Sequence, residues 1–71
     1  MSALERLRGI VGSQADMAEL FSVSEAAIHM WFKRGYLPPI RAVQAQEFCN
    51  DEIQAIEFIV EAMEKGNDGS I

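Results

Sequence analysis

Six side chains suited to contacting another molecule fall on one side of the segment 24–34. They offer a hydroxyl, a carboxylate, an imidazole, an ammonium group and two apolar groups, and they are Ser24, Glu25, Ala26, His29, Met30 and Lys33. Together they can form hydrogen bonds, ionic contacts and methyl contacts. The chemistry that this set indicates is recognition rather than bond breaking.

A helix over this segment would bring the six groups together. At about 100° per residue, Ala27, Ile28, Trp31 and Phe32 fall on the opposite side and form an apolar face. Because Trp31 shares this face with Ile28, we expect it in the core rather than stacked on bases. A helix with one buried and one protruding face fits the major groove of DNA, which is about 12 Å wide. His29 then either contacts the groove or lies in solvent.

Catalytic and metal-binding patterns cannot be assembled from this sequence. His29 has no nucleophile or acidic partner in a recognisable arrangement, and there are no paired carboxylates and no glycine-rich phosphate loop. A single cysteine, Cys49, and a single histidine do not make a tetrahedral zinc site, and no internal disulfide can form. We therefore expect no enzyme activity, metal, cofactor or small-molecule substrate. Cys49 is expected to be a small buried residue in a reducing, intracellular setting.

The charges of the chain are divided unevenly along its length. The formal net charge is −5, which by itself disfavours nucleic acid as a partner. Residues 1–41 nevertheless hold five cations against four acids, a net of +1, whereas residues 42–71 hold one cation against seven acids, a net of −6. We expect the two halves to face different surroundings. No apolar stretch reaches the roughly 18 residues of a membrane span, so a membrane partner is not expected.

Hydrophobic periodicity and capping residues predict helices over residues 3–11, 14–21, 25–34, 39–49 and 52–65. Gly12 and Gly35 end the first and third of these, and Ser13 and Ser24 cap the second and third. No segment alternates like a strand. The fold expected is all-α, a compact bundle of about five helices. It forms one domain over residues 1–65, with a flexible polar tail over residues 66–71.

The second and third predicted helices are separated by a very short turn, which is the spacing of a helix-turn-helix. Small residues are needed where two such helices cross, and Ala18 provides one at the centre of the second helix. Val23 is expected to fill the turn, and Ile28 to point back at Ala18. Ser22 stands where the backbone of this motif is often left-handed, at a cost of roughly 1 kcal/mol for a residue other than glycine.

The segment from Gly12 to Pro39 resembles the Cro-type repressors of temperate phages and the related YdaS-like bacterial regulators. The resemblance covers about residues 4–48, and its helix-turn-helix is of the lambda-repressor-like kind. Its pattern is carried by Gln14, Ala18, Val23-Ser24, Ile28, Trp31, Lys33-Arg34-Gly35 and Leu37-Pro38-Pro39. The last predicted helix has no clear counterpart in this family.

The resemblance implies a role for each position of the motif. Ser24, Glu25, Ala26, His29, Met30 and Lys33 would face base edges. Glu25 could accept a hydrogen bond from cytosine, and Ala26 or Met30 could touch a thymine methyl group. Phosphates would be contacted by Ser13, Gln14, Arg34 and Arg41, with help from the helix dipole at Gln14. The partner implied is double-stranded DNA, in the cytoplasm of a bacterial host cell and associated with its nucleoid.

The last predicted helix carries more apolar surface than one small core requires. Its apolar residues span nearly half the helix, whereas about 100° suffices for packing on one core. We expect part of it to meet a second copy of the chain through Ile53, Ile56, Phe58, Ile59 and Met63. Gln54, Glu57, Glu61 and Glu64 occupy the remaining face, which a two-fold dimer would direct away from the phosphates.

Two functions from different classes remain open at this point. The first is a sequence-specific transcriptional regulator, a Cro-type phage repressor that binds a pseudo-palindromic operator as a homodimer. The second is a protein-interaction module, such as an antirepressor or antitoxin, that keeps the helix-turn-helix as a scaffold. The outward face of the third helix favours the first function, and the net charge of −5 favours the second.

Overall fold

The computed structural model describes residues 2–66 and confirms an all-α fold. Within that range it contains five α-helices, one 3-10 helix and no strand. These elements are α1 (Ala3–Val11), α2 (Gln14–Phe21), α3 (Glu25–Arg34), η1 (Pro39–Arg41), α4 (Ala42–Phe48) and α5 (Ala55–Gly66). Residues 67–71 of the predicted tail lie outside the described residues, and Gly66 belongs to α5.

Serine side chains begin the first three helices. The hydroxyls of Ser2, Ser13 and Ser24 each accept a hydrogen bond from a backbone N–H three residues further on, at 3.0, 3.1 and 3.1 Å. Such caps satisfy donors that would otherwise have no partner in the first turn. The predicted starts of α2 and α3 are therefore confirmed together with their physical cause.

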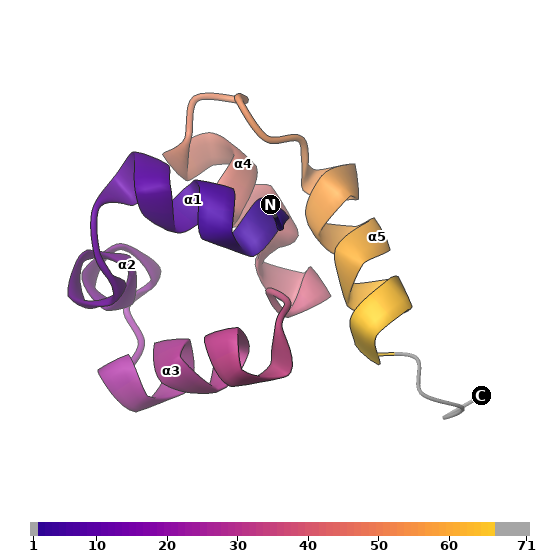
Figure 1. Cartoon of the computed structure of the whole chain (residues 1–71). Helices are drawn as coiled ribbons and strands as arrows, with labels where there is room; N and C mark the ends of the chain where they lie inside the picture. Colours follow the sequence, from indigo (N-terminus) through magenta and orange to yellow (C-terminus); the bar gives the residue numbers. More distant parts are fainter. Residues whose placement is uncertain (1, 67–71) are drawn as a thin grey trace.

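The core forms where α2 and α3 meet α1 and α4. In Figure 1, α2 is seen almost end-on while α3 runs across the lower edge of the molecule, so the two helices cross steeply. The ring of Phe21, in α2, meets Trp31 edge-to-face at 5.2 Å and Phe48 edge-to-face at 4.9 Å between centroids. Phe21 thus joins α2 to both α3 and α4, and Trp31 lies in the core as expected.

The fourth and fifth helices differ from the prediction in their limits. The segment predicted as one helix over 39–49 begins with the 3-10 turn η1, and α4 ends at Phe48. The last helix was predicted from residue 52 but begins at Ala55, because Asn50 and Asp51 take left-handed conformations with φ of 52° and 65°. This reversal carries Ile53 into the core, where its N–H meets the sulfur of buried Cys49 at 3.3 Å.

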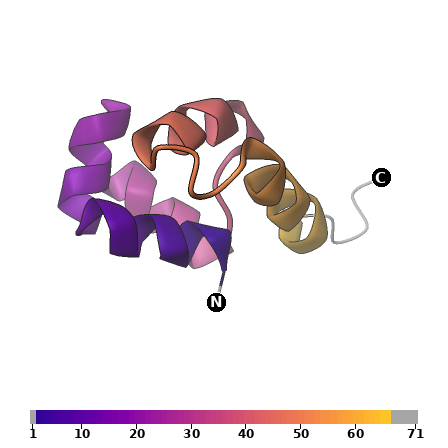
Figure 2. The ribbon, with the colours of Figure 1, turned by 90° about the horizontal axis from the view of Figure 1, so that it is seen from above.

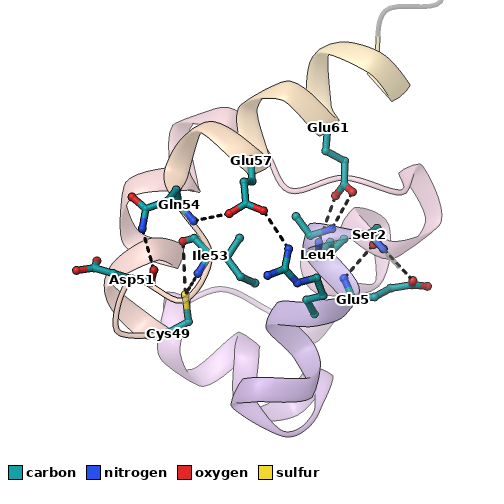
Figure 3. Close-up of polar contacts among 11 residues, drawn as sticks. Ser2, Leu4, Glu5, Cys49, Asp51, Ile53, Gln54, Glu57 and Glu61 are labelled. Carbon is teal, nitrogen blue, oxygen red and sulfur yellow. Dashed lines mark hydrogen bonds and ion pairs between the residues drawn. The ribbon is translucent and has the colours of Figure 1, made fainter.

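The acidic side of α5 is turned toward α1. Figure 3 shows Glu61 pointing at the start of α1, where its carboxylate accepts hydrogen bonds from the backbone N–H groups of Ala3 at 2.9 Å and Leu4 at 3.2 Å. One turn earlier, Glu57 forms an ion pair with Arg6 at 2.9 Å. These contacts fasten the two ends of the described chain to each other, as the view from above in Figure 2 also indicates.

Candidate nucleic-acid interface

The outer face of α3 is open along its whole length. All six predicted base-contacting residues are exposed, namely Ser24, Glu25, Ala26, His29, Met30 and Lys33. On the opposite side Ile28 is 0% and Trp31 6% exposed. The helix therefore has one side anchored in the core and one side that no described element covers.

The junction of α2 and α3 is consistent with a helix-turn-helix. Three residues, Ser22 to Ser24, separate the two helices. Ser22 is left-handed, with φ 58° and ψ 44°. The N–H of half-buried Val23 donates to the carbonyl of Ala18 at 3.0 Å, which closes the end of α2. Ala18 and Ile28 are both buried, as the crossing of the two helices requires.

The beginning of α2 is less free to bind phosphate than the sequence suggests. Ser13 and Gln14 are both half-buried. The hydroxyl of Ser13 already accepts from the N–H of Asp16 at 3.1 Å and donates to the Asp16 carboxylate at 3.0 Å. A carboxylate thus stands at the positive end of this helix. A phosphate contact by Ser13 would have to displace it, while Gln14 remains a candidate.

The two arginines predicted to contact phosphate differ in their surroundings. Arg34 is exposed in the last turn of α3, next in sequence to Lys33 of the outer face. Arg41 is half-buried at the end of η1, and its guanidinium donates to the side-chain oxygen of Gln44 at 2.9 Å. The structure therefore places Arg34 with the outer face of α3, whereas Arg41 is bonded to α4.

Two cations that the sequence did not single out lie against α3. The guanidinium carbon of Arg8, in α1, stands 5.8 Å from the centroid of the Phe32 ring. The side chain of Lys65, in α5, passes over Gly35 at the end of α3. Periodicity could not reveal either contact, because both are formed between helices distant in sequence. One signal was present for Lys65, the only cation among residues 42–71.

The surface expected to meet a second copy needs correction at three of its five positions. Ile53 and Phe58 are 0% exposed and Ile59 packs partly against the core, so the first two cannot contact another chain. Their side chains fill the space between α5 and the rest of the molecule. Ile56 is 60% and Met63 64% exposed, as such a surface requires. Three further exposed apolar side chains were missed: Ile40 at 88%, Val43 at 64% and Val60 at 42%.

A shallow groove of about 350 Å³ lies between α5 and the beginning of α1. It is lined by Ala3, Arg6, Ile56, Glu57, Val60, Glu61 and Glu64. Carboxylates and aliphatic side chains alternate along it, but Glu57 and Glu61 already bond α1. This groove is separate from the outer face of α3.

Comparisons of the chain with protein-family profiles, with curated proteins and with solved structures find no match. None of the helices in residues 2–66 has both the length and the apolar character of a bilayer span.

Proposed function

We propose that this protein is a sequence-specific DNA-binding transcriptional regulator of the Cro-type repressor class. In this proposal α3 enters the major groove, Ser24, Glu25, Ala26, His29, Met30 and Lys33 face the base edges, and Gln14 and Arg34 contact phosphates. The single observation that supports it best is the exposure of all six residues on a helix that buried Ile28 and Trp31, on its other side, anchor in the core. A recognition helix needs both properties, because its register in the groove must be held by the core behind it.

Charge supports the same orientation of the molecule on DNA. Arg34 lies in the last turn of α3, where it would meet the sugar-phosphate backbone, and the charge of base-facing Lys33 stands next to it in the same turn. The carboxylates of Glu57 and Glu61 are turned toward α1 and bonded there. The net charge of −5 therefore overstates the repulsion that a phosphate approaching α3 would meet.

The proposal is tested by selecting bound duplexes from a random pool and then titrating salt against the recovered site. Each phosphate contact adds about 0.9 to the slope of log affinity against log salt, so a steep loss of affinity is expected. A chain that binds no duplex at any ionic strength would exclude the proposed function.

Two substitutions on α3 separate base contacts from phosphate contacts. Glu25→Gln replaces a carboxylate that accepts from cytosine, so we expect a changed base preference in the recovered site, worth about 1–3 kcal/mol at that position. Arg34→Gln is the matched control, since it should weaken binding about equally for every duplex and lower the salt slope by about 1. Identical effects of the two variants would argue against α3 as the recognition helix.

The proposed regulator binds as a homodimer through a corrected surface, the η1–α5 apolar surface, which consists of Ile40, Val43, Ile56, Val60 and Met63. These side chains are 42% to 88% exposed. Because η1 and α4 both pack on α5, residues of all three elements can share one interface. Burying them in both copies would contribute on the order of 10 kcal/mol, comparable with the roughly 4–15 kcal/mol that association costs. We therefore expect a weak dimer in free solution, which forms fully when both copies bind DNA.

A second function, a protein-interaction module of the antirepressor or antitoxin kind, is favoured by the groove between α1 and α5. Its exposed aliphatic side chains stand beside carboxylates, of which Glu64 has no hydrogen bond or ion pair within residues 2–66. Such a surface suits a basic amphipathic partner. Binding of a partner protein by a chain that ignores duplex DNA would favour this function over the first.

A further inference from the structure

The cations that flank the C-terminal half of α3 come from outside the helix-turn-helix. Arg8 belongs to α1 and Lys65 to α5, the first and last helices of the described chain. Both are exposed, and the one ion pair among residues 2–66 involves neither of them. Their charges are therefore not neutralised by a partner in the described part of the molecule.

One of these cations lies against α3 and the other against the glycine that caps its C-terminal end. The Arg8 guanidinium lies over the ring of Phe32, at a distance typical of a cation–π contact. Glu5, one turn before Arg8 on the same helix, bonds to Ser2 instead. The Arg8 side chain is thus directed toward α3 and has no ion pair with Glu5.

Lys65 is positioned by the close approach of α5 to the end of α3. A Cβ atom placed on Gly35, which has φ of 93°, would lie 3.3 Å from Cδ and 3.6 Å from Nζ of Lys65. The next residue, Gly66, packs against the ring of Tyr36, since a Cβ there would meet its Cζ and hydroxyl at 3.0 Å. These two contacts bring the end of α5 to the end of α3 (Figure 1).

We infer that Arg8 and Lys65 extend the phosphate-binding surface of α3 and bind the sugar-phosphate backbone beside the groove that α3 enters. The ligand is the DNA phosphate, and together with Lys33 and Arg34 the surface holds four cations at the C-terminal half of α3. The inference rests on the proposed function, because it assigns the flanks of the same binding site. It also gives a role to Lys65, which is the only cation in the acidic segment 42–71.

The experiment neutralises each cation and measures duplex affinity between about 50 and 200 mM salt. Loss of one phosphate contact should lower the salt slope by about 0.9. Between the two salt concentrations, the factor by which duplex affinity falls should therefore be about threefold smaller for each variant than for the wild type. We expect this result for Arg8→Gln and Lys65→Gln, with no change in base preference. Arg6→Gln is the matched control, since Arg6 is paired with Glu57 away from α3 and its removal should leave the slope unchanged.

Conservative variants separate phosphate binding from a structural role. Arg8→Lys and Lys65→Arg keep the charge, so they should retain the wild-type slope even if the melting temperature falls. A cation that only stabilises the C-terminal end of α3 would change the melting temperature and leave the slope at its wild-type value, which would overturn the inference while the proposed function stands. Absence of duplex binding by the wild type would instead overturn the proposed function, and the inference with it.

Discussion

Ser22 adopts a left-handed backbone at the centre of the turn between α2 and α3, with φ of 58°. This conformation costs a residue with a Cβ atom roughly 1 kcal/mol. The chain tolerates the cost because the turn lets the N–H of Val23 reach Ala18 and lets Ser24 cap α3. A serine at this position therefore weakens the motif without changing its geometry.

Substitutions at the two serines should change stability in opposite directions. Ser22→Gly removes the steric cost and should raise the free energy of unfolding by up to about 1 kcal/mol. Ser24→Ala removes the cap that accepts from the N–H of Ala27, and should lower it by about 1 kcal/mol. Urea denaturation of both variants measures the difference, and a stabilising Ser24→Ala would contradict the capping role.

Asp16 combines a structural benefit with a cost to the proposed DNA contact. Its carboxylate interacts favourably with the N-terminal dipole of α2 but would repel a phosphate bound there. Asp16→Asn should lower the free energy of unfolding by about 0.5 kcal/mol and raise duplex affinity by a factor between about 1.4 and 5, since an exposed charge pair is worth about 0.2–1 kcal/mol. Calorimetry and a duplex titration measure the two effects. Glu19→Gln, in the last turn of the same helix, is the control that should not gain affinity to the same extent.

At the scale of elements, α5 divides its apolar residues between two surroundings. Phe58 and Ala62 are buried against the rest of the fold, whereas Ile56 and Met63 are exposed on the outer side. Of the residues predicted to self-associate, Ile56 and Met63 are therefore exposed, whereas Ile53 and Phe58 are not. One helix can serve a core and a free surface because its apolar arc is wider than one contact requires.

The two sides of α5 should respond differently to truncation. Phe58→Ala opens a cavity in the core and should lower the free energy of unfolding by about 3–5 kcal/mol. Met63→Ser changes an exposed side chain and should alter it by less than about 0.5 kcal/mol in a dilute sample. In sedimentation experiments Met63→Ser should instead weaken self-association. A large loss of stability at position 63 under dilute conditions would place that side chain in the core.

The junction of α5 and α1 makes stability depend on pH. The hydrogen bond from the backbone N–H of Gln54, followed by that from Arg6, holds the pKa of Glu57 below its ordinary value of 4.5. A carboxyl whose pKa is lower in the folded state stabilises the fold at higher pH. Its contribution is complete above about pH 4.5 and is lost as the pH falls through the lowered pKa.

Glu57→Gln tests this dependence directly. The variant lacks the titrating group, so wild type and variant should differ in stability at neutral pH and become more similar in acid. Urea denaturation at about pH 7 and about pH 3 measures the change. A difference that grows on acidification would mean that the pKa of Glu57 is raised rather than lowered in the folded protein.

At the scale of the whole molecule, dimer formation and operator geometry are linked. A two-fold dimer through the η1–α5 apolar surface would present two copies of α3 to successive major grooves, so selected sites should show half-sites 10–10.5 base pairs apart, about 34 Å. Because association stabilises the folded state by mass action, the melting temperature should rise with protein concentration. Selected sites without two-fold symmetry, together with a constant melting temperature, would indicate a monomeric binder.

Local sequence signals were sufficient to predict α1, α2 and α3. Ser13, Ser24, Gly12 and Gly35 act within a few residues of their own position, so their effect on the chain does not depend on distant contacts. The same holds for the division of α3 into a face with Ile28 and an opposite exposed face. For this reason the sequence predicts correctly that the six residues of the candidate interface are exposed.

The all-α class, the first three helices and the outward face of α3 follow from caps and periodicity, which are short-range properties of the chain. Contacts between distant helices are needed to know which part of α5 is buried, that Glu61 caps α1, and that Arg8 and Lys65 lie against α3. This is because an apolar arc wider than one contact, or a long charged side chain, has several equally good local arrangements. The position of a neighbouring helix, set by the packing of the whole core, selects among them.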